Sequence, residues 1–190
     1  HEDVPRQIMG KYWIPKLFRK IFSLCFEWYE NFVCKRIDAV ITATPFIKKR
    51  FLKVNQNSEN VNNYPVLSSV LQSDLSSSEV VYIGGLTKTR GIIELIKAFA
   101  FVEKAVSLHI YGKFENNEIE KQALDLIRNQ ENIYFHGFKS QDDIKKVLTR
   151  ARIGICTLHP LTNYLDSLPV KAFEYMRHGI PIVMSDFDFW

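Results

Sequence analysis

Cysteine is scarce in this sequence, and long apolar runs are absent. The 190 residues contain three cysteines, Cys25, Cys34 and Cys156, which form no CxxC pair and are odd in number. These features argue against a disulfide framework and favour a reducing compartment, so we expect a cytoplasmic protein. The sequence shows no secretory signal, and it lacks the run of about 18 apolar residues that a membrane-spanning helix needs.

The sequence also has only a small excess of positive over negative charge. The formal net charge is +4 and the pI is near 8.9. This mild basicity suits anionic ligands or an anionic membrane surface, but it is too weak to indicate a nucleic-acid-binding protein. The 46% of hydrophobic residues can form a core of ordinary size. Because the chain starts at His1 and stops at Trp190, directly after a predicted strand, we interpret it as an internal fragment.

Apolar residues recur at steps of three and four between residues 13 and 33, which predicts an amphipathic helix. We favour a helix packed in a domain core. The alternative is a helix at the inner face of an anionic membrane, because basic residues stand among aromatic ones. The basic residues are Lys11, Lys16, Arg19 and Lys20, and the aromatic ones are Tyr12, Trp13 and Phe18.

The next segment predicts a strand over residues 38–44 and a helix with Thr44 as its N-cap and Pro45 as its first residue. A short strand around Val61 and a serine-rich stretch follow. We therefore expect residues 1–65 to be the end of one Rossmann-like domain, 66–78 to be a linker, and 79–190 to be a second such domain, truncated at its C-terminus.

Strand and helix patterns alternate regularly beyond the linker. Strands are predicted over residues 79–85, 106–112, 132–138, 152–158 and 180–186, and helices over 90–104, 117–130, 141–151 and 168–179. This alternation is typical of βαβ units, so the fold class is α/β, with a parallel sheet covered by helices on both faces. Ligands of such sheets bind outside the carboxyl ends of the strands.

The loop after the first of these strands has the residue types that bind phosphate. Gly84 and Gly85 let the backbone approach a ligand, and Lys88 and Arg90 add positive charge at the start of a helix. The spacing fits neither the P-loop nor GxGxxG. Taken alone, this loop is an ordinary turn with two solvated basic residues.

The loops after the next two strands each place a glycine, Gly112 or Gly137, beside an aromatic residue. Such loops could line a base or ribose pocket, although they are also ordinary turn chemistry. We interpret His136 as a half-buried structural histidine. No GxGxxG follows any strand, which disfavours a nicotinamide-binding enzyme.

The stretch DSLPVKAFE places Asp166 and Glu174 eight positions apart around the start of a helix. Pro169 suits the first helical turn, and Ser167 could cap it. The two carboxylates could bind sugar hydroxyls while Lys171 and free N–H groups face an anion. The alternative is that Asp166 interacts with the helix dipole and Glu174 is a partly exposed helix residue. From the residues alone, both interpretations stay open.

Two segments together, SLPVKAFEYMRHGIPIVMSD and YIGGLTKTRGIIELIKAF, resemble the C-terminal domain of GT-B glycosyltransferases, in particular family 4, or glycosyl transferases group 1. The resemblance extends from about Ser78 to the end, and the stretches HEDVP, DAVITAT and NNYP resemble the end of the N-terminal domain. It implies a hexosyltransferase of polysaccharide biosynthesis that uses a nucleotide-diphosphate sugar, acts on a glycan or lipid-linked acceptor and retains the anomeric configuration. No cofactor or metal is expected.

The resemblance also implies roles for individual residues. Glu174 would contact the ribose, Asp166 the hydroxyls of the transferred sugar, and His1 the same sugar from the other domain. Asp166 stands where the family more often has Glu. The leaving diphosphate would be neutralised by Arg90 with Gly85, and by Lys88 or Lys171. The remaining donor-binding residues would be Gly84, Gly112, Gly137, Ser167, Leu168 and Pro169.

Two alternatives to transfer stay open. One is a nucleotide-sugar epimerase on the same GT-B architecture, which would need no acceptor. The other is a fragment that binds nucleotide without catalysis.

Overall fold

The computed structural model of the chain describes residues 3–11, 13–64, 73–74 and 76–190. These residues form two compact units. Unit 1 comprises the residues up to Asn63 together with Pro160–Leu168 and Phe187–Trp190, and unit 2 comprises Tyr64–His159 and Pro169–Asp186. This division differs from the expected domains because two late segments group with the N-terminal residues. His1, Tyr12 and most of the predicted linker lie outside the described residues.

Unit 2 is built on a five-stranded parallel sheet, as the sequence predicted. The strands are β3 (Glu79–Ile83), β4 (Ser107–Tyr111), β5 (Ile133–Phe135), β6 (Ile153–Cys156) and β7 (Ile182–Met184), in the order β5-β4-β3-β6-β7. The connections contain the 3-10 helix η1 (Lys88–Arg90) and the helices α4 (Ile92–Phe99), α5 (Asn117–Ile127), α6 (Gln141–Leu148) and α8 (Val170–Arg177). The predicted α/β fold is therefore confirmed.

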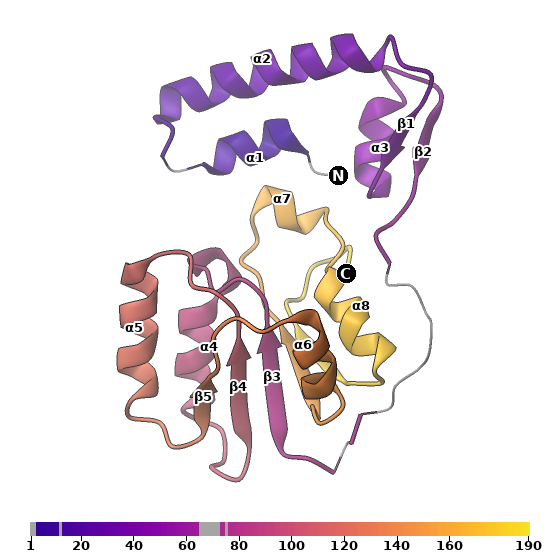
Figure 1. Ribbon diagram of the computed structural model, residues 1–190. Helices are drawn as coiled ribbons and strands as arrows, with labels where there is room; N and C mark the ends of the chain where they lie inside the picture. The colour runs from indigo at the N-terminus through magenta and orange to yellow at the C-terminus, as the bar shows by residue number, and fades with distance from the viewer. Residues whose placement is uncertain (1–2, 12, 65–72, 75) are drawn as a thin grey trace. The chain divides into compact units, whose positions relative to one another are not determined.

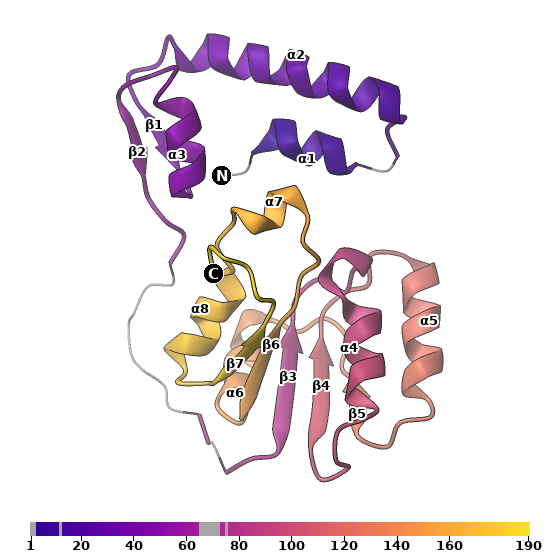
Figure 2. The same cartoon turned by 180° about the vertical axis from the view of Figure 1, so that it is seen from behind.

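Helices cover both faces of this sheet. On one face, α4 and α5 pack on alternate strand residues such as Val80, Leu108 and Ile110. On the other face, α6 and α8 pack on the intervening residues Val81 and Ile83. Figure 1 shows α6 in front of the sheet, and Figure 2 shows α4 on the opposite side. Alternation of side chains along each strand supplies an apolar set to both faces, as a doubly covered parallel sheet requires.

One buried tyrosine fixes α8 to the sheet. Tyr175 is fully buried, and its hydroxyl accepts a hydrogen bond from the Ile83 N–H (3.2 Å) and donates one to the Ile155 carbonyl (3.3 Å). Its ring occupies the space beside Gly154, where a Cβ would lie 2.5 Å from ring atoms. Strands β3 and β6 are thus joined to the helix that carries Lys171 and Glu174.

Unit 1 contains α1 (Val4–Gly10), α2 (Lys16–Cys34), β1 (Val40–Thr42), α3 (Pro45–Phe51), β2 (Ser58–Asn60) and α7 (Thr162–Leu165). The predicted cap of α3 is confirmed, because the Thr44 side chain accepts a hydrogen bond from the Ile47 N–H. Strands β1 and β2 form a separate two-stranded parallel sheet. The sequence reasoning assigned neither α1 nor α7.

The long helix α2 turns its polar side toward the rest of unit 1. The Ser23 hydroxyl donates to the Pro5 carbonyl (2.8 Å), Arg19 Nε donates to the Ile14 carbonyl (2.6 Å), and Glu30 pairs with Arg50. The apolar side is exposed in the described part of the chain: Leu17, Phe18, Ile21, Phe22, Leu24, Phe26, Trp28, Tyr29, Phe32 and Val33. The expectation of a helix packed in a core is therefore wrong for the residues described.

Candidate nucleotide-sugar site

Three glycines bring the loops after β3, β4 and β5 close together at the carboxyl edge of the sheet. The Gly84 N–H donates to the Tyr111 carbonyl, and the Gly112 N–H donates to the Gly137 carbonyl, both at 3.0 Å. A Cβ on Gly112 would lie 1.8 Å from the Gly84 carbonyl oxygen. Only glycine at this position allows the two loops to approach so closely. The rim thus exposes backbone where a ligand can bind.

Arg90 lies against the first of these loops. Its backbone N–H is bound by the Thr87 hydroxyl (3.2 Å), which caps η1, and its carbonyl accepts from the Thr157 hydroxyl (2.9 Å). A Cβ on Gly84 would lie 2.9 Å from Arg90 Nη1. The guanidinium therefore packs over Gly84 and Gly85, and a side chain at Gly84 would displace or crowd it. Lys88, two positions earlier, is exposed.

The positive charges of Arg90 and Lys171 both influence the pKa of the Cys156 thiol at the end of β6. Burial raises the pKa of the Cys156 thiol, while the positive charges of Arg90 and Lys171 oppose the rise. Because charges must be near a group to change its pKa, both cations lie close to the carboxyl end of β6. Residues 81 positions apart in the sequence (171 − 90) are thus brought together at the rim.

Glu174 lies one helical turn from Lys171 and pairs with it. Lys171 Nζ is 2.7 Å from Glu174 Oε2, and both side chains are about one-third exposed. An ion pair with this exposure contributes little to stability, so it can be exchanged for ligand contacts at small cost. Arg90 and Glu174 therefore lie at the same edge of the sheet, as the predicted site requires.

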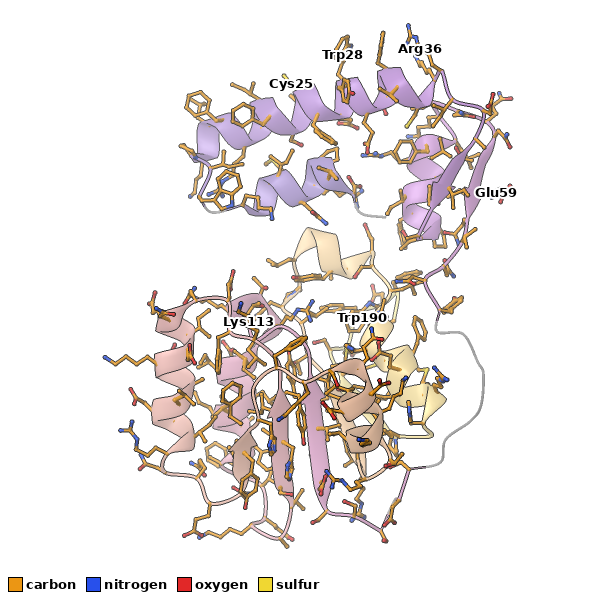
Figure 3. All side chains as sticks on the ribbon, viewed as in Figure 1. Cys25, Trp28, Arg36, Glu59, Lys113 and Trp190 are labelled. Carbon is orange, nitrogen blue, oxygen red and sulfur yellow. The ribbon has the colours of Figure 1, made fainter. Side chains whose placement is uncertain are left out.

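A cavity of about 880 Å³ opens at this edge. It is lined by five of the predicted donor-binding residues: Gly84, Gly85, Gly112, Lys171 and Glu174. Lys113 and Phe138, from the two glycine loops, also line it. Figure 3 labels Lys113 in the loop after β4. A volume of this size is typical of small-molecule and cofactor sites.

The sequence reasoning missed the part of the cavity between α6 and α8. Gln141 and Lys145 line it from α6, and Arg177 and His178 from the end of α8. His178 is 4% exposed, and its Nδ1 donates to the Glu174 carbonyl (2.9 Å). Nothing in the α6 sequence distinguishes these residues from those of an ordinary amphipathic helix, so only the tertiary packing shows them.

The other residues of the D-x7-E stretch are not all in unit 2. Asp166, Ser167 and Leu168 belong to unit 1, whereas Pro169 and Glu174 belong to unit 2. The prediction that Ser167 caps the following helix is wrong. Pro169 occupies the N-cap position without a side-chain cap, and the Ser167 hydroxyl donates to the Tyr164 carbonyl (3.0 Å) instead.

Asp166 has a partner that the sequence reasoning did not foresee. Its Oδ2 accepts a hydrogen bond from Arg6 Nη1 at 2.6 Å, between two residues of unit 1 that are 160 positions apart. Asp166 ends α7, and its side chain is 31% exposed. The dipole interaction at the start of α8 is therefore not its main contact.

The sequence predicted a site role for His1 and a structural role for His136. His1 lies outside the described residues. His136 stacks on Tyr111 (ring centroids 4.6 Å apart), and its Nε2 is 2.9 Å from His109 Nδ1. Burial lowers the pKa of both histidines, and for His136 the charge of His109 lowers it further. A half-buried, stacked and hydrogen-bonded imidazole fits the structural role predicted for His136.

An open parallel sheet with a cationic, glycine-lined cavity at its carboxyl edge defines a Rossmann-like domain of the kind that binds phosphorylated ligands. The sequence matches the family described as Glycosyl transferases group 1 over residues 66–189. The chain belongs to this family, and its fold is that of GT-B glycosyltransferases. No curated protein matches the chain.

Solved structures show the same fold at low sequence identity. A TarM variant from S. aureus, in complex with fondaparinux, α-GlcNAc-glycerol and UDP, is 19% identical with a TM-score of 0.65, covering 85% of this chain and 32% of TarM. Anabaena HepE with UDP-glucose is 18% identical (TM-score 0.61), covering 77% of this chain and 44% of HepE. Pneumococcal O-GlcNAc transferase GtfA, with UDP and GlcNAc, is 15% identical with a TM-score of 0.62, covering 83% of this chain and 32% of GtfA. The chain thus spans a third to a half of these structures.

Proposed function

We propose that the protein transfers a sugar from a nucleoside-diphosphate sugar to a glycan or a lipid-linked acceptor, with retention of anomeric configuration. The observation that carries the proposal is the position of Arg90, Lys171 and Glu174 at one edge of the sheet, beside the glycine-lined cavity. TarM, HepE and GtfA were solved with UDP or UDP-glucose, which supports a uridine nucleotide as donor carrier.

The proposed chemistry follows from the charges of the rim. Cleavage of a sugar–diphosphate bond develops negative charge on the leaving phosphate and positive charge on the anomeric carbon. Arg90 and Lys171 would stabilise the phosphate charge, with Lys88 as a further, exposed cation. Preorganised donors of this kind can contribute the largest single share of rate enhancement.

The remaining roles concern orientation of the donor. Glu174 would bind the ribose hydroxyls. Its carboxylate would then either give up its hydrogen bond from Lys171 or accept hydrogen bonds from Lys171 and the ribose together. Phe138, which is 78% exposed and lines the cavity, offers an apolar surface for the base. Asp166 and His1 would contact the transferred sugar. Gly112, Gly137 and the backbone from Ser167 to Pro169 would border the nucleotide.

Product analysis of the full-length protein with UDP-sugars tests the proposal. Transfer requires an acceptor, so sugar is expected to move to an added glycan or lipid-linked acceptor and the donor is expected to stay unchanged without one. Conversion of the donor sugar in the absence of acceptor would show an epimerase. Binding of UDP without any turnover would support a binding function instead.

A metal-free mechanism is part of the proposal. Because Arg90 and Lys171 supply the positive charge at the rim, we expect turnover to be unchanged within about twofold after dialysis against EDTA. Turnover is measured before dialysis, after it, and after addition of Mg²⁺ or Mn²⁺. Loss of activity with EDTA and recovery with either ion would contradict this part of the proposal.

We also propose that unit 1 is part of an acceptor-side Rossmann-like domain whose further strands cover the apolar side of α2. Parallel sheets are normally buried on both faces, yet the β1–β2 pair has exposed Ile41 (71%) and Val61 (61%) beside it. Helix α2 directly precedes β1, which is the position of a crossover helix from another parallel strand. Figure 3 shows Cys25 and Trp28 on the side of α2 away from α1.

The alternative is that the apolar side of α2 contacts the inner face of an anionic membrane. Lys16 and Lys20 are exposed at the start of α2, and Trp13 is 69% exposed beside them. None of the helices formed by the described residues is long and apolar enough to cross a membrane. The exposed apolar residues of α2 extend from Leu17 to Val33, well beyond the two lysines at its start, which favours a sheet over a lipid headgroup region.

Cys25 provides a direct probe, because it is exposed in the apolar part of α2. We expect Cys25 in the full-length protein to react with a water-soluble maleimide at least about tenfold more slowly than a reference cysteine, as expected for a thiol covered by protein. Lys121→Cys on the exposed side of α5 is the reference, and peptide mass spectrometry assigns each label.

The conditions of labelling separate the possible occupants. Protection without lipid and at every protein concentration supports coverage by the protein's own strands. Protection that appears only with vesicles containing anionic lipid would show membrane contact. Protection that disappears on dilution would show a second copy of the chain.

A further inference from the structure

We propose that Arg6 is a positioning residue for the donor sugar and acts through Asp166. This inference rests on the proposed function, because it assumes that the Asp166 carboxylate accepts hydrogen bonds from hydroxyls of the transferred sugar. It concerns residues of unit 1 only. Arg6 itself makes no contact with the donor in this proposal.

Arg6 contacts one of the two carboxylate oxygens of Asp166. Arg6 Nη1 is 2.6 Å from Asp166 Oδ2, so this contact uses that oxygen and the proposal assigns Oδ1 to the sugar. Asp166 follows the four-residue helix α7, so its backbone belongs to a short and locally weak element. A charge-assisted hydrogen bond to one oxygen restricts the orientation of the carboxylate.

Arg6 also contacts Asp3, which forms a more buried ion pair with Arg50. Arg6 Nε lies 3.3 Å from Asp3 Oδ2, and Asp3 Oδ1 accepts from Arg50 Nη1 at 3.1 Å. Arg50 also pairs with Glu30 of α2. The side-chain exposure falls from 45% at Arg6 to 19% at Arg50 and 13% at Asp3.

The resulting order of charges alternates from Asp166 to Arg6, Asp3, Arg50 and Glu30. It connects the loop after α7 with α1, α3 and α2. Arg6, Asp3 and Arg50 each have two partners of opposite charge. Moving any one of these side chains would therefore leave its partners with an uncompensated charge. Such a network fixes the position of Asp166 more firmly than a single exposed ion pair could.

The alternative is an ion pair that only helps α1 to pack. That role predicts a small loss of stability and no change in sugar recognition, because partly exposed pairs contribute little. A positioning role predicts a specific change instead. The test must therefore read out which sugar hydroxyl the enzyme recognises, as well as how fast it turns over.

The experiment uses the full-length protein, its best UDP-sugar and the monodeoxy derivatives of that sugar. Asp166→Asn is expected to abolish discrimination against one deoxy position. Arg6→Gln is expected to lower kcat/KM by about tenfold to a hundredfold and to reduce discrimination at the same position. Arg6→Lys is expected to restore it in part, since lysine supplies the charge but not the planar guanidinium that also contacts Asp3. The affinity for UDP, which lacks the sugar, is expected to stay unchanged in each variant.

Arg128→Gln is the matched control, because Arg128 at the end of α5 is exposed and pairs with the exposed Asp125 (3.4 Å). It is expected to behave as wild type. An Arg6→Gln enzyme with wild-type discrimination would overturn the inference, and so would one with equal losses for all donors and for UDP. Retained discrimination in Asp166→Asn would overturn it too. Absence of any transfer by the wild-type enzyme would instead refute the proposed function.

Discussion

Replacement of Arg90 by alanine is expected to lower kcat of the full-length enzyme by about a hundredfold to a thousandfold, as for loss of one preorganised charge stabiliser. The guanidinium packs over Gly84 and Gly85 at the rim and is near the end of β6, where the leaving phosphate would develop its charge. Steady-state kinetics with a UDP-sugar and acceptor provide the measurement. The effect should fall mainly on kcat, since the charge is largest in the transition state.

Lys88→Ala is the matched control for this variant. Lys88 lies in the same 3-10 helix, is exposed and carries the same charge. It is expected to change turnover by less than about tenfold, because a solvated lysine loses little transition-state stabilisation when removed. Thermal unfolding of both variants should lie close to that of wild type. Equal effects of the two substitutions would show that general rim charge, rather than the placement of Arg90, is what matters.

Gly112→Ala is expected to disrupt the site and to destabilise the protein by at least about 2 kcal/mol, the size of a strong steric clash in packed structure. The added Cβ would lie 1.8 Å from the Gly84 carbonyl oxygen, which is backbone and cannot rotate away. The loops after β3 and β4 must therefore separate. Because both line the cavity, UDP affinity should fall together with stability.

Chemical denaturation and calorimetric titration with UDP measure the two effects. Gly137→Ala is the comparison, since a Cβ there meets nothing within 4 Å but the backbone has φ +69°. It should cost only about 1 kcal/mol, the strain of an L-residue in the left-handed region. A Gly112→Ala protein with wild-type stability and UDP affinity would show that the two loops do not need their close approach.

Most of the fold of unit 2 could be predicted from the sequence because its strands and helices have clean periodicities. Residues 79–83 and 107–111 are short apolar runs that end in glycine loops, and the intervening stretches have helical patterns. The short helices α1 and α7 could not be predicted in this way. A helix of four or seven residues has too few turns to show a periodicity, and its stability comes from tertiary contacts.

The site could be predicted only in part. The rule that ligands bind at the carboxyl ends of parallel strands pointed to the loops with Gly84, Arg90 and Glu174, and the family resemblance favoured these residues as a site. The structure brings the three residues to one edge. The contribution of α6 and the contact between Arg6 and Asp166 depend on packing between distant segments. A single sequence contains no local signal for either. The exposed apolar side of α2 was missed for the opposite reason: its pattern predicts burial, but the described residues do not supply the covering surface.

Calorimetric titration of the full-length protein with UDP tests the central claim most directly. The account predicts binding at one site per chain and a loss of affinity of about tenfold to a hundredfold in Glu174→Ala, as for removal of a charged hydrogen-bond partner. Lys171→Ala should weaken binding as well, because both side chains line the cavity. Failure of the protein to bind any nucleoside diphosphate, or wild-type affinity in both variants, would contradict it.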